Sequence, residues 1–173
     1  MKTIIILAMH GVPPHDFPRA ELAEFFTLQG QLRRGAGQEK SAALERYSQL
    51  NTRIKNWPRT ARNDPFYAAS HELARHLSGT TNREVVVGFN EFCAPDLQEA
   101  LEMAVRKGAA QIVVVTPMMT RGGEHAEVEI PALLKAFHSA HPEIQTVYAW
   151  PFDIEEVARF LSRQIARFTA ETR

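Results

Sequence analysis

The chain begins with the stretch TIIILAMHG, residues 3–11, in which apolar side chains occupy successive positions before a histidine and a glycine. Successive rather than alternating apolar residues are typical of a strand covered on both faces, as in a parallel sheet. Three more short apolar runs follow at residues 84–89, 111–116 and 145–150. Together the four runs predict a parallel sheet buried between helices.

Helical patterns alternate with these runs. The clearest spans residues 96–107 and places four apolar side chains on one face: Leu97, Ala100, Leu101 and Ala104. Pro95 stands where a first helical residue is expected, and Gly108 follows two basic residues where a helix would stop. Further helices are expected at about residues 127–140 and 154–170. This alternation is typical of crossover units in an α/β fold.

The segment between the first two strands is longer than one crossover helix requires, since about 70 residues separate Gly11 from Glu84. Two amphipathic patterns account for the excess, and their apolar positions are Leu22, Phe25, Phe26 and Leu32, then Ala43, Tyr47, Leu50, Ile54 and Trp57. Gly35 and Gly37 separate them. We therefore expect a helical hairpin inserted over residues 18–63. A third helix, capped by Asp64 and ending near Gly79, would be the true crossover.

Composition sets broad limits on the class of protein. The 173 residues are 45% hydrophobic and 23% charged, which fits one globular domain over residues 1–173 and excludes disordered and disulfide-scaffold classes. Twenty basic residues balance 20 acidic ones, so no overall positive field favours nucleic acid. No apolar run is long enough to span a membrane. The single cysteine, Cys93, fits a reducing compartment, and we expect a cytoplasmic protein.

The balanced charge conceals an uneven distribution. Residues 1–83 carry 12 basic and 7 acidic side chains, whereas residues 84–173 carry 8 and 13. Most of the basic excess lies in the insertion, at Arg33, Arg34, Lys40, Arg46, Arg53, Lys55, Arg59 and Arg62. These side chains either meet an anionic ligand or form ordinary solvated helix faces.

Candidate ligands for a metal ion follow three of the predicted strands. In open parallel sheets the ligand crevice lies at the carboxyl ends of the strands, where this chain has His10, Glu91 and, after a glycine-containing loop, His125. Imidazole nitrogens with a carboxylate oxygen suit divalent cobalt, iron, nickel or zinc better than magnesium or calcium. Two alternatives remain open: His10 bonds only to a neighbouring loop, and Glu91 caps the helix that begins at Pro95.

The loop before His125 offers further candidates. His125 and Glu129 stand four residues apart, so on a helix they could share a metal ion or a proton, or Glu129 could instead interact with the helix dipole. Met118 and Met119 are either ligand contacts or core residues. The glycine pair ending at Gly123 lets the loop turn before the histidine. Cys93 is a candidate nucleophile or metal ligand, or else a small buried apolar residue.

Five segments of the chain resemble a known family: residues 4–11, 94–101, 108–117, 123–125 and 129–131. They are similar to the CbiX/SirB-type sirohydrochlorin chelatases, the single-domain class II tetrapyrrole metal chelatases. The resemblance covers the first eleven residues and about residues 84–150, but not the insertion. It implies a three-layer, chelatase-like α/β fold whose four-stranded parallel sheet has the order 2-1-3-4.

The resemblance also implies an activity and its residues. The activity is ATP-independent insertion of Co(II) or Fe(II) into a tetrapyrrole such as sirohydrochlorin, by a homodimer without an organic cofactor. The family's metal-binding and catalytic positions fall on His10, His125 and Glu91. From the chemistry of the residues themselves we further expect that Glu91 assists proton removal and that Met118, Met119 and Gly123 contact the macrocycle. The same donor set would also accept nickel or zinc.

Two departures and two alternatives accompany this interpretation. The family's usual Gly-His-Gly-Ser is Met9-His10-Gly11-Val12 here, and Glu129 replaces a more usual aspartate. The same ligands would also serve a non-catalytic carrier or sensor of metal or tetrapyrrole. A third possibility is a regulatory α/β domain whose hairpin docks a partner helix.

Overall fold

The computed structural model describes residues 1–34 and 40–169, so Gly35 and Gly37 lie outside the described residues. Its centre is a four-stranded parallel sheet of order β2-β1-β3-β4, as expected. The strands are β1 (Thr3–Met9), β2 (Glu84–Phe89), β3 (Gln111–Val115) and β4 (Gln145–Tyr148). The last two end slightly before the predicted residues 116 and 150, and a proline follows each of them, at Pro117 and Pro151.

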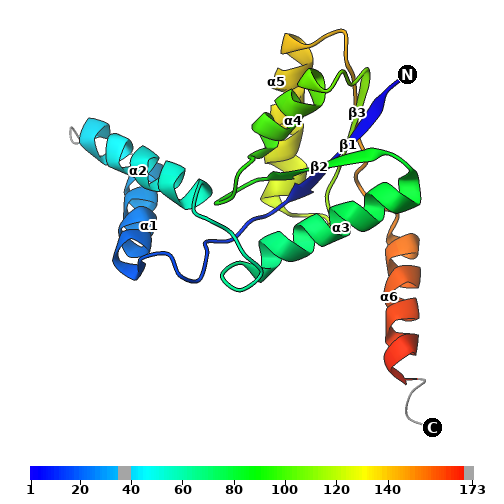
Figure 1. Ribbon diagram of the computed structural model, residues 1–173, viewed down its shortest axis with the longest axis horizontal. Coiled ribbons are helices and arrows are strands. Elements are labelled where there is room, and N and C mark those ends of the chain that lie inside the picture. The colour runs from blue at the N-terminus through cyan, green and yellow to red at the C-terminus, as the bar shows by residue number, and fades with distance from the viewer. Residues whose placement is uncertain (35–39, 170–173) are drawn as a thin grey trace.

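One face of the sheet is covered by α4 (Leu97–Arg106) and α5 (Ile130–Ala140), as Figure 1 shows. Alternate β1 side chains point to these helices, and the cluster includes Ile4, Ile6, Ala8, Ile112 and Val114 from the strands, with Leu97, Leu101, Leu134 and Phe137 from the helices. This apolar core fixes the carboxyl ends of β1 and β3 relative to the helix that carries the candidate site.

The start of α4 differs from the expected one. The helix begins at Leu97 rather than at Pro95, and Asp96 caps it: its carboxylate accepts a hydrogen bond from the Glu99 amide at 2.9 Å, while the Glu99 carboxylate accepts one from the Asp96 amide at 2.8 Å. This reciprocal pair satisfies two amides that the first helical turn leaves unpaired. Glu91 therefore does not cap this helix, and that alternative is wrong.

The other face is partly covered by α3 (Pro65–Thr81). Its cap is Asp64, as predicted, but the helix continues past Gly79 to Thr81 and ends at Asn82, whose φ of 51° is left-handed. The second apolar cluster includes Leu7, Met9, Val87 and Phe89 from the strands, Ala74 from α3, and Phe17, Phe25, Leu50, Ile54, Phe92 and Cys93. The loops that follow β1 and β2 therefore pack against both α3 and the insertion.

The inserted hairpin forms as expected and consists of α1 (Arg19–Arg33) and α2 (Lys40–Lys55). Figure 1 shows it beside one end of the sheet, next to the chain that leaves β1. Phe25, Leu50 and Ile54 bury against the second cluster, whereas Phe26 is half-exposed. The prediction of one domain over residues 1–173, with an insertion bounded at 18 and 63, stays a prediction.

The side of the sheet near β4 is less covered than the strand pattern predicts. Val147 of β4 pairs with Val113 of β3 on the α3 side of the sheet and is 37% exposed. The expectation that every strand is buried on both faces is therefore wrong for β4. The last helix, α6 (Ile154–Thr169), does not cover this face and projects away from the body in Figure 1. Within the described residues no helix is both long and apolar enough to cross a membrane.

Candidate metal centre

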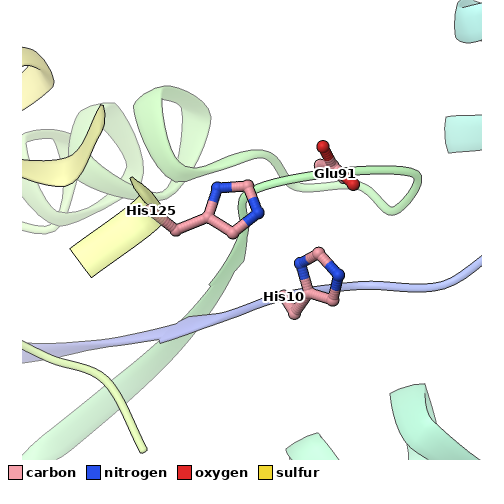
Figure 2. A group of neighbouring side chains, drawn as sticks. All are labelled: His10, Glu91 and His125. Atoms are coloured by element: carbon pink, nitrogen blue, oxygen red, sulfur yellow. The ribbon is translucent and has the colours of Figure 1, made fainter. Parts of the chain in front are cut away.

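Three side chains from separate parts of the chain meet at the carboxyl end of the sheet. Figure 2 shows His10, Glu91 and His125 facing one another across a small gap. One ligand atom from each lies within 4.8 Å of the other two, and the two imidazole rings are 4.9 Å apart between centroids. His10 is exposed, and the other two are partly buried. The three side chains thus converge on one rim of the sheet, as predicted.

The His10 and Glu91 loops are held in register by a continuation of the β1–β2 ladder. The Asn90 amide donates to the Met9 carbonyl at 2.8 Å, and the Glu91 amide donates to the His10 carbonyl at 2.9 Å. Gly11 then passes so close to this loop that a Cβ there would lie 1.9 Å from the Glu91 carbonyl oxygen. Its φ of 93° also favours glycine. Close backbone approach therefore brings the two ligand loops together.

His125 begins a π-helical turn, η1 (His125–Glu129), that leads directly into α5. The helix therefore starts about two residues before the predicted residue 127. From β4, the Tyr148 hydroxyl donates to the Ala126 carbonyl at 3.0 Å, and burial raises the pKa of Tyr148 to about 12. The wide turn is consequently fixed against the sheet immediately beside the histidine.

Glu129 lies on the same side of this turn as His125. Its carboxylate oxygen is 2.5 Å from Nδ1 of His125, and no side-chain hydrogen bond caps the following helix at this position. The alternative in which Glu129 interacts only with the helix dipole is therefore incomplete, because the Glu129 carboxylate contacts the His125 ring. A carboxylate on Nδ1 fixes the ring orientation and leaves Nε2 as the nitrogen that can bind an ion. Glu129 is a site residue that sequence reasoning weighed but did not choose.

The geometry suits a divalent transition ion. Two ligand atoms bound to the same ion at about 2.1 Å can be separated by at most about 4.2 Å, so side-chain shifts of about 1 Å would close the group around an ion. Two imidazole nitrogens and one carboxylate oxygen form a borderline-soft donor set. Three protein ligands also leave room for a further ligand, as catalytic centres do and four-coordinate structural centres do not.

The three predicted macrocycle contacts lie in the loop between β3 and η1. Met118 packs against the first apolar cluster, and its carbonyl accepts a hydrogen bond from the Trp150 indole at 3.0 Å. Met119 is partly buried, and a Cβ at Gly123 would meet open space. It is Gly122 that has the positive φ, 93°. A ligand contact at Met118, Met119 or Gly123 stays a prediction.

Cys93 does not join the ligand group. Its side chain is fully buried, and burial raises the pKa of the thiol, which disfavours the thiolate needed for nucleophilic attack or metal binding. The thiol lies 3.8 Å from an Asp64 carboxylate oxygen. The interpretation as a buried apolar residue is therefore the right one. His15 is exposed on the same loop as His10 and is not part of the ligand group.

Two small grooves adjoin the candidate metal centre between the hairpin and α5. Each has a volume of about 250 to 260 Å³, and both are lined by Lys55, Asn90 and Glu129. One of them also includes Arg33, Asn51 and Glu91. Within the described residues, Nδ2 of Asn90 is buried without a hydrogen-bond partner. A larger cavity of about 820 Å³ lies elsewhere, around Trp57 and Asn63, and contains none of the three ligands.

Several basic residues of the insertion already have partners. Arg46 pairs with Glu24 at 2.7 Å, Arg53 pairs with Glu21, and Lys55 pairs with Asp96 at 2.8 Å. Arg59 is buried in an ion pair with Asp64. The insertion is therefore less available to an anionic ligand than its charge count indicates, and Arg33 and Lys55 are the basic residues that line the grooves beside the centre.

Comparison with known proteins places the chain in a family. Residues 61–167 match the family model of CbiX. A sirohydrochlorin cobaltochelatase from Saccharolobus islandicus (strain L.S.2.15 / Lassen #1) is 38% identical over 91 residues, which cover 49% of this chain and 70% of that enzyme. A sirohydrochlorin ferrochelatase from Priestia megaterium is 27% identical over 70 residues, which cover 40% of this chain and only 26% of the relative.

Among solved structures, a CbiX protein from Marinobacter aquaeolei VT8 aligns over 99% of both chains with a TM-score of 0.53 and 16% identity, a likeness of fold. The family model covers more than half of this chain, and most of the Saccharolobus enzyme is matched. The chain therefore belongs to the CbiX family.

Proposed function

We propose that the protein inserts Co(II) or Fe(II) into a tetrapyrrole such as sirohydrochlorin without ATP. The observation that carries this proposal is the convergence of His10, Glu91 and His125 on one exposed rim. Relatives named sirohydrochlorin cobaltochelatase and ferrochelatase support the substrate class. No organic cofactor is invoked, and nickel or zinc would bind the same donor set.

In the proposed reaction the metal ion is a substrate that the three side chains hold at the rim. Two pyrrole N–H protons must leave as the ion enters the macrocycle, so the centre needs nearby groups that accept protons. Glu91 would complete the ligand group and receive a proton. Glu129 holds the His125 ring by Nδ1, so that Nε2 faces the shared space.

The adjoining grooves support a substrate with carboxylate arms. Each groove is too small for a macrocycle, and we infer that the ring lies over the exposed rim near Met119 and Gly123. A carboxylate arm that enters the groove would meet Arg33 and the unpaired Asn90 donor, and also Lys55, which would share its charge with Asp96. Such charge-assisted bonds would orient the ring above the ligand group.

We further propose that the protein works as a homodimer. The apolar face of α6 is exposed, and it carries Ile154, Leu161, Ile165 and Phe168. Its first turn has Glu155 and Glu156, and its last turn has Arg167. Two such helices packed antiparallel would bury both apolar faces and place acidic turns beside basic turns, which is the self-complementary pattern of a two-fold interface.

Anaerobic incubation with sirohydrochlorin and Co(II) or Fe(II), without ATP, tests the activity through the absorption change of the macrocycle. We expect acceleration over the free-solution rate, and its loss in both His10→Ala and His125→Ala. His15→Ala is the matched control, because it removes an exposed histidine from the same loop. Metal binding without acceleration would support a carrier instead, and normal rates in both histidine variants would refute the assignment. The cytoplasmic location stays a prediction.

A further inference from the structure

Arg59, in the segment between α2 and α3, differs from the other basic residues of the insertion because it is buried. Its side chain is 5% exposed, and that of its partner Asp64 is fully buried. A buried guanidinium requires both a counter-ion and hydrogen-bond acceptors to offset its lost hydration. The acceptors that Arg59 uses connect it to the metal centre.

The guanidinium contacts four separate segments. Nη1 donates to the Val12 carbonyl at 2.8 Å and to the Asp64 carboxylate at 2.5 Å. Nη2 donates to the Ile54 carbonyl at 2.9 Å and to the Phe92 carbonyl at 2.6 Å. Val12 lies two residues after His10, and Phe92 directly follows Glu91. One side chain thus joins both ligand loops to the end of α2 and the start of α3.

The loop at Glu91 has a reason to need this support. Phe92 has a φ of 58°, which is rare for a side chain of its size and persists where surrounding contacts hold the backbone. The backbone bonds between the two ligand loops end at Glu91, and the Arg59 bonds to Val12 and Phe92 begin just beyond them. The guanidinium therefore holds the loops together where the ladder stops.

We propose that Arg59 is a positioning residue for the metal centre: it fixes the separation of His10 and Glu91 by binding the backbone that follows each. It contacts neither the ion nor the macrocycle. Lysine could keep the ion pair with Asp64, but its single ammonium cannot span the Val12, Ile54 and Phe92 carbonyls in the planar arrangement that a guanidinium offers. The effect on metal binding rests on the proposed function, whereas the effect on the loops does not.

The test compares Arg59→Lys with Arg53→Lys. Arg53 belongs to the same insertion, pairs with partly buried Glu21 and lies over the Phe17 and Trp57 rings, but within the described residues it donates no hydrogen bond to the Val12 or Phe92 backbone. In Arg59→Lys we expect amide hydrogen exchange at Asn90 and Glu91 to rise at least tenfold while exchange in β1 is unchanged. Co(II) affinity, measured by titration, should fall at least tenfold. Arg53→Lys should change neither, and added guanidinium should recover part of the Co(II) affinity in Arg59→Ala.

A folded Arg59→Lys protein with unchanged exchange at Asn90 and Glu91 overturns the proposal, whatever the activity. If the wild type binds no Co(II), the proposed function fails, and the exchange data still decide the role of Arg59. If the Arg59 variants do not fold, nuclear magnetic resonance of the wild type decides: the Arg59 side-chain N–H signals should exchange slowly with water, and those of Arg53 rapidly. Rapid exchange at Arg59 contradicts the four bonds on which the inference rests.

Discussion

The hydrogen bond between Glu129 and His125 determines which histidine nitrogen faces the centre. Because Nδ1 is engaged by a carboxylate 2.5 Å away, Nε2 is the available ligand, and the negative charge makes it a better donor to a cation. An amide in place of the carboxylate would keep the size of the side chain and remove its charge. Such a variant therefore separates the effect of the Glu129 charge on metal binding from the effect of the His125 ring itself.

Glu129→Gln should weaken Co(II) binding by about 10- to 100-fold, the usual effect of losing a partner behind a metal-binding histidine. Isothermal titration with Co(II) measures it. Glu127→Gln is the matched control, since Glu127 belongs to the same turn but pairs with Arg121. Equal losses in the two variants would show that charge near the turn, rather than the bond to His125, controls affinity.

Gly11 and Gly122 form a second matched pair, because both have a φ of 93° but differ in their surroundings. Alanine at Gly122 meets no atom within 4 Å, so it should cost only the backbone strain of about 1–2 kcal/mol. Alanine at Gly11 would lie 1.9 Å from the Glu91 carbonyl oxygen, and it should cost at least about 2 kcal/mol more. Urea denaturation measures both, and similar losses would contradict the close approach.

At the level of residues, the sequence allowed the meeting of His10, Glu91 and His125 to be predicted, but not the residues that support them. Their role as metal ligands stays a prediction. His10, Glu91 and His125 follow strand ends, a position that is visible without coordinates. The role of Glu129 depended on whether a helical turn had begun by residue 125, which spacing cannot decide. Arg59 was one of eight basic residues in the insertion, and no pattern marked it as buried.

At the level of elements, the start of α4 connects the hairpin to the sheet. Asp96 accepts a hydrogen bond from Lys55 of α2 at 2.8 Å as well as from its own helix. Burial acts to raise the pKa of Asp96, but the bonds from Lys55 and from the Glu99 amide outweigh it and leave the pKa below the ordinary value of 3.8. Ionised Asp96 is therefore favoured by folding.

This shift predicts a pH dependence of stability. Because the folded pKa is lowered, the contribution of Asp96 is complete above the ordinary value of 3.8 and is lost as the pH falls through the lower folded value. Asp96→Asn should be less stable than wild type in urea at pH 7, and the difference should shrink below pH 3.8. Glu72→Gln, at an exposed site on α3, should show no such trend. A stability difference between wild type and Asp96→Asn that stays constant with pH would exclude the charge of Asp96 as its cause.

The elements themselves were predicted with different success for physical reasons. Asp64 as a cap, the four strands and the hairpin follow from side-chain chemistry and periodicity, which act locally. The exposure of one face of β4 could not be predicted in this way, since an apolar run has the same sequence pattern whether or not a helix packs on it. The π-helical turn at His125 was equally invisible, because it replaces one hydrogen-bond spacing by another without changing the sequence pattern.

On the scale of the whole molecule, exposed apolar side chains on α6 and β4 bear on how copies of the chain assemble. On the face of α6, Leu161, Ile165 and Phe168 are 51%, 62% and 73% exposed, and Val147 is exposed on the open side of β4. An exposed apolar stripe of this length on one helix is unusual for a protein that acts alone. A second copy could cover both surfaces at once.

Sedimentation velocity should therefore show the mass of two chains for the wild type and of one chain for the double variant Leu161→Glu, Ile165→Glu. Both substitutions lie on the apolar face of α6, whereas Ser162→Glu lies on its polar face and should leave the assembly unchanged. A folded double variant that still sediments as a dimer would show that the interface does not involve α6.

The exposure of His10 has a consequence for how long an ion would stay. A cation held by three side chains, one of them open to water, keeps a free position through which an incoming ligand can replace the protein donors one by one. Such a rim favours short residence and rapid delivery over storage. The opening at His10 through which an ion would leave is thus two residues from Val12, whose carbonyl Arg59 holds in place.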